Sequence, residues 1–264
     1  MNLYFAQIRQ TMPMSRPITI QEVLDRLDII IEEAIVNNNR LGLFAYIYRR
    51  TTAEIHKELQ LGNFEDNKRL EKLDVEFANL YLDAYQNHKN KKKVSKSWEL
   101  AFTAKGEPLT IVQHIMLGMN AHINLDLGIA TSTTMTGKQL PGIENDFHKV
   151  NDILFAIVNE MQDLLSRVSR LLFLLDLAGK NSDEKVIDFS MRKAREQSWN
   201  SANLLWALED DQRTEAIKGL DTLVLKLSER IKSPKSKVVG FVLKTISRFE
   251  EKDVGKIISR LRED

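Results

Sequence analysis

Apolar residues recur at steps of three and four along most of the chain, the spacing that places them on one face of an α-helix. Thr19 and Glu22 have the spacing of a capping box, in which each side chain satisfies a free backbone N–H at a helix start. The apolar face that follows this box consists of Val23, Leu24, Leu27, Ile30, Ile31 and Ala34. The pattern therefore predicts that the first helix begins at "TIQE".

The same spacing predicts further helices over about 43–61, 65–86, 109–129 and 186–209, and a long one from 143 to about 177. A short helical segment is expected around "SWELAF", and a loop is expected at "ATSTTMTGKQLPG". Glycine and proline number only 11 and 5, and no run of alternating β-branched residues is present. We therefore expect an all-α fold, a multi-helix bundle with long core helices.

The last part of the chain shows two or three amphipathic segments, broken at "KSPKSK" and near "EEKD". We expect a helical core domain over residues 1–209, with C-terminal helices over residues 210–264 packed on that core. No internal repeat or sustained heptad pattern is present.

Composition and the pattern at the start of the chain limit the classes of binding partner and the cellular compartment that we expect for this protein. The 38 basic and 37 acidic residues nearly cancel, which argues against a nucleic-acid partner. The absence of cysteine excludes disulfides and thiolate metal sites. The start of the chain lacks the pattern of a secretion signal, and the apolar run "LLFLLDLAG" is too short to span a bilayer. We expect a soluble, cytoplasmic protein without a membrane span.

Polar residues interrupt the apolar segment "VQHIMLGMNAHINLDLG", residues 112–128. His114, Gly118, His122 and Asp126 fall within one broad arc of a helix, and His122 and Asp126 are direct i, i+4 neighbours. Gly118 leaves space for an ion, a water or a ligand. Apolar residues occur all round this helix, so it is expected to be buried and its polar groups need partners.

A second segment, "DFHKVNDILFAIVNE", partly repeats this pattern, because His148 and Asp152 are again four residues apart. Asn159 lies two turns beyond Asp152, and Glu160 lies at the edge of the same stripe. The stripe is roughly opposite the main apolar face, so the alternative is that it faces water.

Two His-x-x-x-Asp pairs on successive helices match the requirement of a metal site in a bundle core, where imidazole and carboxylate ligands converge. We expect a divalent metal, Zn, Mn or Fe, with ester or phosphoester hydrolysis by a metal-bound water. Asp74 or Glu160 would complete the ligand shell or act as a general base. The predicted metal ligands are His114, His122, Asp126, His148 and Asp152.

Other interpretations remain open at this stage. A His and an Asp four residues apart often only bond to each other, which would make the protein a helical scaffold or a small-ligand-binding protein. An iron- or haem-dependent oxidase is a third alternative. Asp74 shares a face with Phe77 and Tyr81, and if buried it needs a histidine or an arginine as a partner. Arg195 and Trp199 are placed to stack or to line a pocket.

Three blocks of the chain resemble a known family: "GNFEDNKRLEKLDVEFANLYLDAY", "HIMLGMNAHINLDLGIA" and "DFHKVNDIL". They look like the sequence blocks of an uncharacterised bacterial family, one of the domains of unknown function, over about residues 40–210. The resemblance implies an all-helical fold and no assigned activity.

The two His-x-x-x-Asp pairs are also similar to those of zinc-dependent phospholipase C and related helical nucleases. The matching positions are His122 with Asp126 and His148 with Asp152. The chain lacks the N-terminal tryptophan ligand, the secretion signal and the remaining histidines of those families. The resemblance therefore implies a mononuclear or dinuclear metal site at most.

Overall fold

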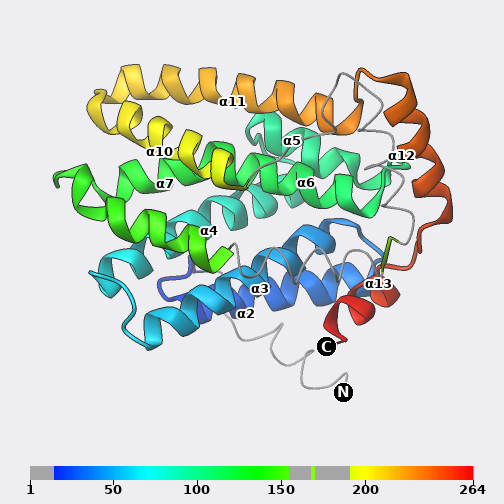
Figure 1. The fold of residues 1–264 in the computed structure, drawn as a ribbon, viewed down its shortest axis with the longest axis horizontal. Coiled ribbons are helices and arrows are strands. Elements are labelled where there is room, and N and C mark those ends of the chain that lie inside the picture. The colour runs from blue at the N-terminus through cyan, green and yellow to red at the C-terminus, as the bar shows by residue number, and fades with distance from the viewer. Residues whose placement is uncertain (1–14, 155–167, 170–190, 264) are drawn as a thin grey trace.

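The structure is a computed structural model that describes residues 15–154, 168–169 and 191–263 (Figure 1). These residues form helices and loops and include no β-strand, which confirms the all-α bundle. None of the helices in these ranges combines the length and apolar character needed to cross a lipid bilayer. Glu160, Asn159 and the rest of the helix predicted beyond residue 154 lie outside the described residues.

The N-terminal part folds as α2 (Ile20–Val36), α3 (Leu41–Gln60) and α4 (Asn67–Lys89). The predicted capping box is present, because Thr19 and Glu22 each accept a backbone N–H of the other. The short turn between α2 and α3 uses Asn38 in the left-handed region, with φ of 48°. Gly42 lies directly against the side chain of Ala34, so the two helices approach where no larger residue would fit.

A long central helix follows the short α5 (Lys96–Thr103). It is made of α6 (Ile111–Ala121), a π-helical turn, η2 (His122–Asp126), and α7 (Leu127–Thr134). The prediction of a loop from residue 130 is wrong for its first five residues. Thr131 and Ser132 donate their hydroxyls to the carbonyls of Leu127 and Ile129 at 2.8 and 2.9 Å, which suits a helix.

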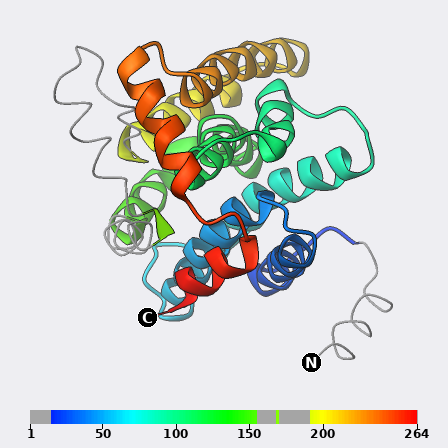
Figure 2. The same cartoon turned by 90° about the vertical axis from the view of Figure 1, so that its right-hand side faces the viewer.

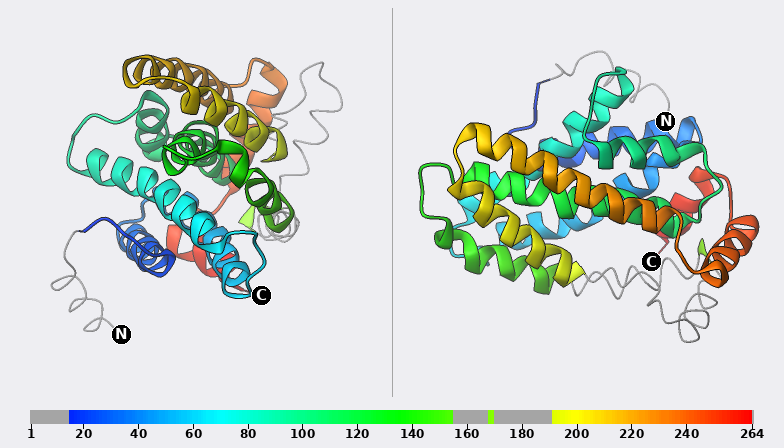
Figure 3. Two further views of the ribbon diagram at one scale, coloured as in Figure 1. Left: turned by 90° about the vertical axis from the view of Figure 1, so that its left-hand side faces the viewer. Right: turned by 90° about the horizontal axis from the view of Figure 1, so that it is seen from above.

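The chain continues through the 3-10 turn η3 (Leu140–Ile143) and a helix over 144–154. It resumes with α10 (Met191–Ala207), α11 (Asp210–Lys232), α12 (Lys237–Phe249) and α13 (Val254–Arg262). The views of Figures 1 and 3 place the central helix between the α2–α3 pair and α11. Residues of the central helix are therefore surrounded by other helices.

Hydrogen bonds fasten the C-terminal helices to the rest of the bundle. The side-chain amide of Asn120 donates to Ser228 Oγ at 2.8 Å, and that of Gln113 donates to the Ile231 carbonyl at 2.8 Å. The Tyr46 hydroxyl donates to the Leu261 carbonyl at 2.7 Å, where α13 packs beside α2 and α3 (Figure 2). These bonds connect α11 and α13 to the central helix and to α3.

Two buried carboxylates from these C-terminal helices satisfy backbone N–H groups at the starts of other helices. Asp221 accepts bonds from the backbone nitrogens of Lys96 and Ser97 at 2.8 and 3.0 Å, at the start of α5. Glu250 accepts a bond from the backbone nitrogen of Ile111 at 2.8 Å, at the start of α6. The first N–H groups of a helix have no partner inside the helix. The two carboxylates supply acceptors for these groups, and they also connect the C-terminal part of the chain to α5 and α6.

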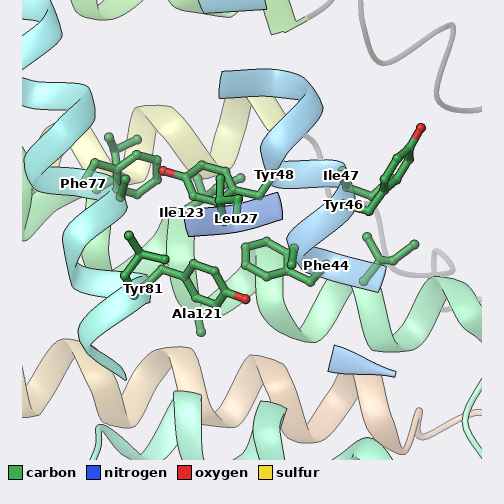
Figure 4. Close-up of a cluster of buried hydrophobic side chains, with 14 of the residues drawn as sticks. Leu27, Phe44, Tyr46, Ile47, Tyr48, Phe77, Tyr81, Ala121 and Ile123 are labelled. Atoms are coloured by element: carbon green, nitrogen blue, oxygen red, sulfur yellow. The ribbon is translucent and has the colours of Figure 1, made fainter. Parts of the chain in front are cut away.

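Aromatic rings fill the space between α3, α4 and the central helix (Figure 4). Phe44 meets Tyr81 edge to face with ring centroids 5.1 Å apart, and Tyr81 lies 5.2 Å from Trp98 of α5. The ring of Phe44 lies against Gly118. The space that Gly118 leaves is thus filled by a side chain, and the sequence-based expectation of room for an ion at that point is wrong.

Candidate functional site

The π-helical turn lies at the middle of the buried central helix and begins at His122. Such turns are rare and are frequent at functional sites, because the extra residue changes the direction of neighbouring side chains. Ser198 of α10 contacts the Ile123 carbonyl in this turn and also the Ala194 carbonyl, the latter at 2.9 Å. A neighbouring helix thus supplies a hydroxyl where the backbone pattern changes.

His122 and Asp126 form the i, i+4 pair that the sequence predicts. Nδ1 of His122 lies 3.0 Å from Oδ2 of Asp126, and both residues are almost completely buried. The indole N–H of Trp98 donates to the same Oδ2 at 2.9 Å. Burial raises the pKa of Asp126 well above its usual value, and the bond from Trp98 opposes that rise. Burial also lowers the pKa of His122 well below its usual value, so the imidazole is neutral near pH 7.

Aromatic rings pack against the imidazole of His122. The ring of His122 stacks on Phe77 with centroids 3.7 Å apart and planes 5° from parallel, and it meets Tyr48 edge to face at 4.4 Å. Nε2 of His122 is buried and has no hydrogen-bond partner among the described residues. A buried polar atom without a partner costs free energy, so this nitrogen needs an explanation.

A cavity lies beside His122, between α3, α4, the central helix, the helix over 144–154 and α10. It holds about 80 Å³ of space for the centres of water molecules, several times the roughly 10–15 Å³ that one water needs. Its walls are mainly apolar, and the residues that form them include Phe44, Ile47, Leu73, Phe77, Ile123 and Phe147.

Five polar side chains also line this cavity: Tyr48, Thr51, Asp74, His122 and Arg195. The hydroxyl of Thr51 already donates to the Tyr48 carbonyl at 2.8 Å. The hydroxyl of Tyr48 and Oδ2 of Asp74 are buried and, like Nε2 of His122, lack a partner in the described parts of the chain. Thr52, one turn after Tyr48, holds another such hydroxyl. It lies close enough to the Tyr48 hydroxyl to lower the pKa of that phenol, against the larger rise caused by burial, and it is not among the residues that line the cavity. Three of the buried polar atoms without a partner in the described residues thus belong to residues that line one apolar cavity, whereas others, such as Nε2 of His114, lie away from it.

Asp74 and Arg195 give this cavity its charges. Burial raises the pKa of Asp74 to about 7, and the positive charge of Arg195 opposes that rise. Burial lowers the pKa of Arg195 to about 10, which leaves its guanidinium charged near pH 7. Arg195 donates to Asn151 Oδ1 at 2.5 Å and to the Phe147 carbonyl at 2.7 Å. Arg195 therefore acts on Asp74 through its charge, and no hydrogen bond or ion pair joins these two described residues.

Arg195 differs in one respect from the expectation that it would stack on Trp199. The guanidinium carbon of Arg195 lies 4.6 Å from the ring centroid of Phe147. The ring centroid of Trp199 lies 5.0 Å from that of Phe147 and 5.6 Å from that of His148. Arg195 and Trp199 therefore both contact Phe147, and no cation–π contact between Arg195 and Trp199 occurs among the described residues.

His114 lies on α6, two turns before His122, which separates the two residues by about 12 Å along the helix axis. It is buried, and it is not among the residues that line the cavity. Burial, with a smaller contribution from the charge of Arg40, lowers the pKa of His114 to about 3. His114 is thus a neutral interior histidine outside the site around His122.

His148 and Asp152 line a groove on the outside of the bundle, with Arg192, Glu196 and Trp199. The side chain of His148 is 43% exposed, and its Nε2 lies 3.9 Å from Glu144 rather than beside Asp152. The alternative that this stripe faces water is the one that the structure supports for these residues.

The structure does not bring the five predicted metal ligands together. Only His122 and Asp126 are paired. His114 lies two turns before His122 on the same helix, and His148 and Asp152 lie at the surface. The described residues contain no group of three or more His, Cys, Asp or Glu side chains that could hold a metal ion. Of the five predicted ligands, the structure thus pairs only His122 with Asp126, and only His122 lines the apolar cavity.

Tyr48 and Trp98 are the site residues that the sequence analysis missed. Tyr48 lies within the aromatic run "LFAYIY", where it reads as an ordinary core position. Trp98 lies in the short helix "SWELAF", 28 residues before Asp126, and no spacing rule connects the two. A buried tryptophan needs an acceptor for its N–H, and that was the available signal.

The chain belongs to a family of unknown function, DUF5995, whose profile matches residues 20–234. The match confirms the resemblance inferred from the three sequence blocks, and it extends through α11. No curated protein and no solved structure matches the chain significantly, so no similarity to zinc-dependent phospholipase C is shown.

Proposed function

We propose that this protein binds a small, mainly apolar molecule in the cavity beside His122. One observation carries the proposal: Tyr48, Asp74 and His122 line the same apolar cavity, and each holds a buried polar atom without a partner in the described residues. Ligand sites are typically apolar pockets in which a few polar groups fix the orientation of the ligand.

Several features support a site rather than a packing defect. The cavity is bounded by five helical segments, so its polar atoms are held in place by the surrounding core. Well-packed interiors contain few voids larger than a water molecule, and voids that remain are usually apolar. This cavity is partly open, and its lining includes an imidazole, a carboxyl group and a phenol besides the apolar side chains. A ligand with an apolar body and a polar group would contact the apolar side chains and also form hydrogen bonds with these polar groups.

The geometry gives less support to metal-dependent hydrolysis of an ester or phosphoester. A catalytic zinc site has three protein ligands as a rule. His122 contributes one free nitrogen, and Asp126 already accepts two hydrogen bonds. Among the described side chains, only Asp74 joins His122 as a lining residue of metal-binding type.

The test is a ligand screen against the purified protein with a variant that reduces the cavity. A library of small aromatic and aliphatic molecules is screened by thermal shift, and hits are confirmed by protein-observed NMR. Val150→Phe enlarges a side chain that lines the cavity and should abolish binding of the hits. Val238→Phe makes the same change at a residue that is 58% exposed on α12 and should leave binding intact. Hits that bind both variants equally would place the ligand elsewhere.

A further inference from the structure

We infer that the ligand is uncharged and that it donates a hydrogen bond from an O–H or N–H group to Nε2 of His122. This inference rests on the proposed binding function and names the chemical class of the ligand. It begins with the question of which imidazole nitrogen carries the proton.

The hydrogen bonds around Asp126 answer that question. Oδ2 of Asp126 receives the indole N–H of Trp98 and also faces Nδ1 of His122. The hydroxyl oxygen of a protonated carboxyl is a poor acceptor, so an oxygen that accepts from Trp98 is the unprotonated one. We therefore assign the proton of the second bond to Nδ1 of His122, the tautomer in which Oδ2 accepts both bonds. A neutral imidazole with its proton on Nδ1 presents a bare lone pair at Nε2.

A bare lone pair in an apolar cavity selects a donor. The cavity offers acceptors at Nε2 of His122 and at Oδ2 of Asp74, and the Tyr48 hydroxyl acts as donor or acceptor. A purely apolar ligand would leave these atoms unpaired, and a ligand with only acceptors would repel the lone pair. An alcohol, a phenol or an amide N–H satisfies it.

The charges at the cavity favour an uncharged donor. Arg195 and Asp74 are the charged side chains among the lining residues, and they have opposite signs. An ammonium group would add a second positive charge beside Arg195, and a carboxylate would face Asp74 and the lone pair of His122. A charge placed in an apolar site without a matched partner is costly. A neutral hydroxyl or amide avoids both penalties.

The experiment compares probes of similar size on the unmodified protein: toluene, phenol, benzylammonium and benzoate. Affinities are measured by NMR titration and calorimetry. Phenol should bind about 2–10-fold more tightly than toluene, as a net hydrogen bond predicts, and both charged probes should bind more weakly than phenol. Equal affinities for toluene and phenol, or tighter binding of a charged probe, would overturn the inference while the binding function stands. Binding of none of the four, with no hit from the screen, counts against the function itself.

A spectroscopic readout makes the test independent of the stability of any variant. In protein labelled with ¹⁵N-histidine, His122 should show a protonated Nδ1 and an unprotonated Nε2, and phenol should shift the Nε2 signal upfield. A protonated Nε2 in the free protein would overturn the inference. His122→Leu, where it folds, should reverse the preference so that toluene binds at least as tightly as phenol. Zn²⁺ is titrated alone as a further probe, and a shift at Nε2 with Zn²⁺ but not with phenol would also overturn it.

Discussion

The indole nitrogen of Trp98 and Oδ2 of Asp126 lie 2.9 Å apart in the interior of the bundle, although the two residues are 28 positions apart in sequence. The same Oδ2 lies 3.0 Å from Nδ1 of His122, and with the proton on Nδ1, as inferred above, this oxygen accepts both bonds. In that arrangement Trp98, on the short α5 helix, favours the tautomer of His122 that leaves Nε2 without a proton.

Trp98→Phe tests this relationship. Phenylalanine keeps much of the apolar packing but removes the N–H donor, which leaves Asp126 with one hydrogen bond fewer. We expect the free energy of unfolding to fall by about 1–3 kcal/mol, measured by urea denaturation. Trp206→Phe is the matched control, because Trp206 is 37% exposed and water can replace its bond to the Lys138 carbonyl. If both variants lost the same free energy of unfolding, the buried hydrogen bond of Trp98 would contribute no more to stability than the exposed bond of Trp206.

The raised pKa of Asp74 predicts that the stability of the protein depends on pH. Its pKa is about 7 in the folded protein, against 3.8 as the ordinary value, because burial disfavours the carboxylate. Between these two pH values the folded state holds a proton that the unfolded chain has lost. The free energy of unfolding should therefore fall as pH rises from about 4 to about 7 and show no further loss from this group above that.

Asp74→Asn removes this loss, because the amide has no proton to lose. The variant should match the unmodified protein near pH 4 and be more stable at pH 8, by up to about 4 kcal/mol at 1.36 kcal/mol per pKa unit. The measurement is a series of denaturation curves across this pH range. Asp152→Asn, at an exposed position, is the control and should change stability less at every pH. A difference between Asp74→Asn and the unmodified protein that stays constant with pH would contradict the assignment.

The sequence predicted the helices well because their apolar faces repeat along the chain, and the capping box at Thr19 is a local signal. It also predicted that the segment around His122 is buried, since apolar residues surround it on every side. Both features depend on residues that are near each other in sequence. The loop from residue 130 was the main error, because Thr131 and Ser132 favour turns until their hydroxyls bond to helix carbonyls.

The site was predicted only in part, for a physical reason. The spacing of His122 and Asp126 revealed their pairing, but spacing does not say which helix faces which. His148 and Asp152 have the same spacing, yet their stripe turns toward solvent. Tyr48, Asp74 and Arg195 meet His122 at one cavity only because α3, α4 and α10 pack around the central helix. Such contacts between distant segments leave no periodic signal in one sequence.

The lowered pKa of His114 predicts that the protein loses stability in acid. Its pKa is lowered from 6.5 to about 3, mainly by burial, so the folded protein keeps it neutral while the unfolded chain binds a proton below about pH 6.5. The stability that it contributes is present above pH 6.5 and is lost as pH falls toward 3. His114→Gln should flatten the decline of stability over this range, measured by denaturation at a series of pH values. The same change at the exposed His148 should flatten it less, and an equal effect of both would refute the role of burial.

Gly118 offers a direct test of the packing over the site. A Cβ at this position would lie 2.8 Å from Cδ2 and 2.9 Å from Cβ of Phe44, closer than real side chains approach. Gly118→Ala should therefore destabilise the protein by about 1–3 kcal/mol, although alanine favours helices. Gly219→Ala is the matched control within α11, where a Cβ meets nothing within 4 Å, and it should stabilise by about 0.5–1 kcal/mol.

The opposite signs of these two changes, measured by urea denaturation, would distinguish a steric clash from a backbone effect. Phe44→Leu in the Gly118→Ala background should cost less than Phe44→Leu alone, because removing the ring also relieves the clash. Such non-additivity is expected for residues in direct contact. If the two substitutions add without any interaction energy, Phe44 is not the neighbour that limits this position, and the wall of the cavity near Phe44 is less closely packed than the structure indicates.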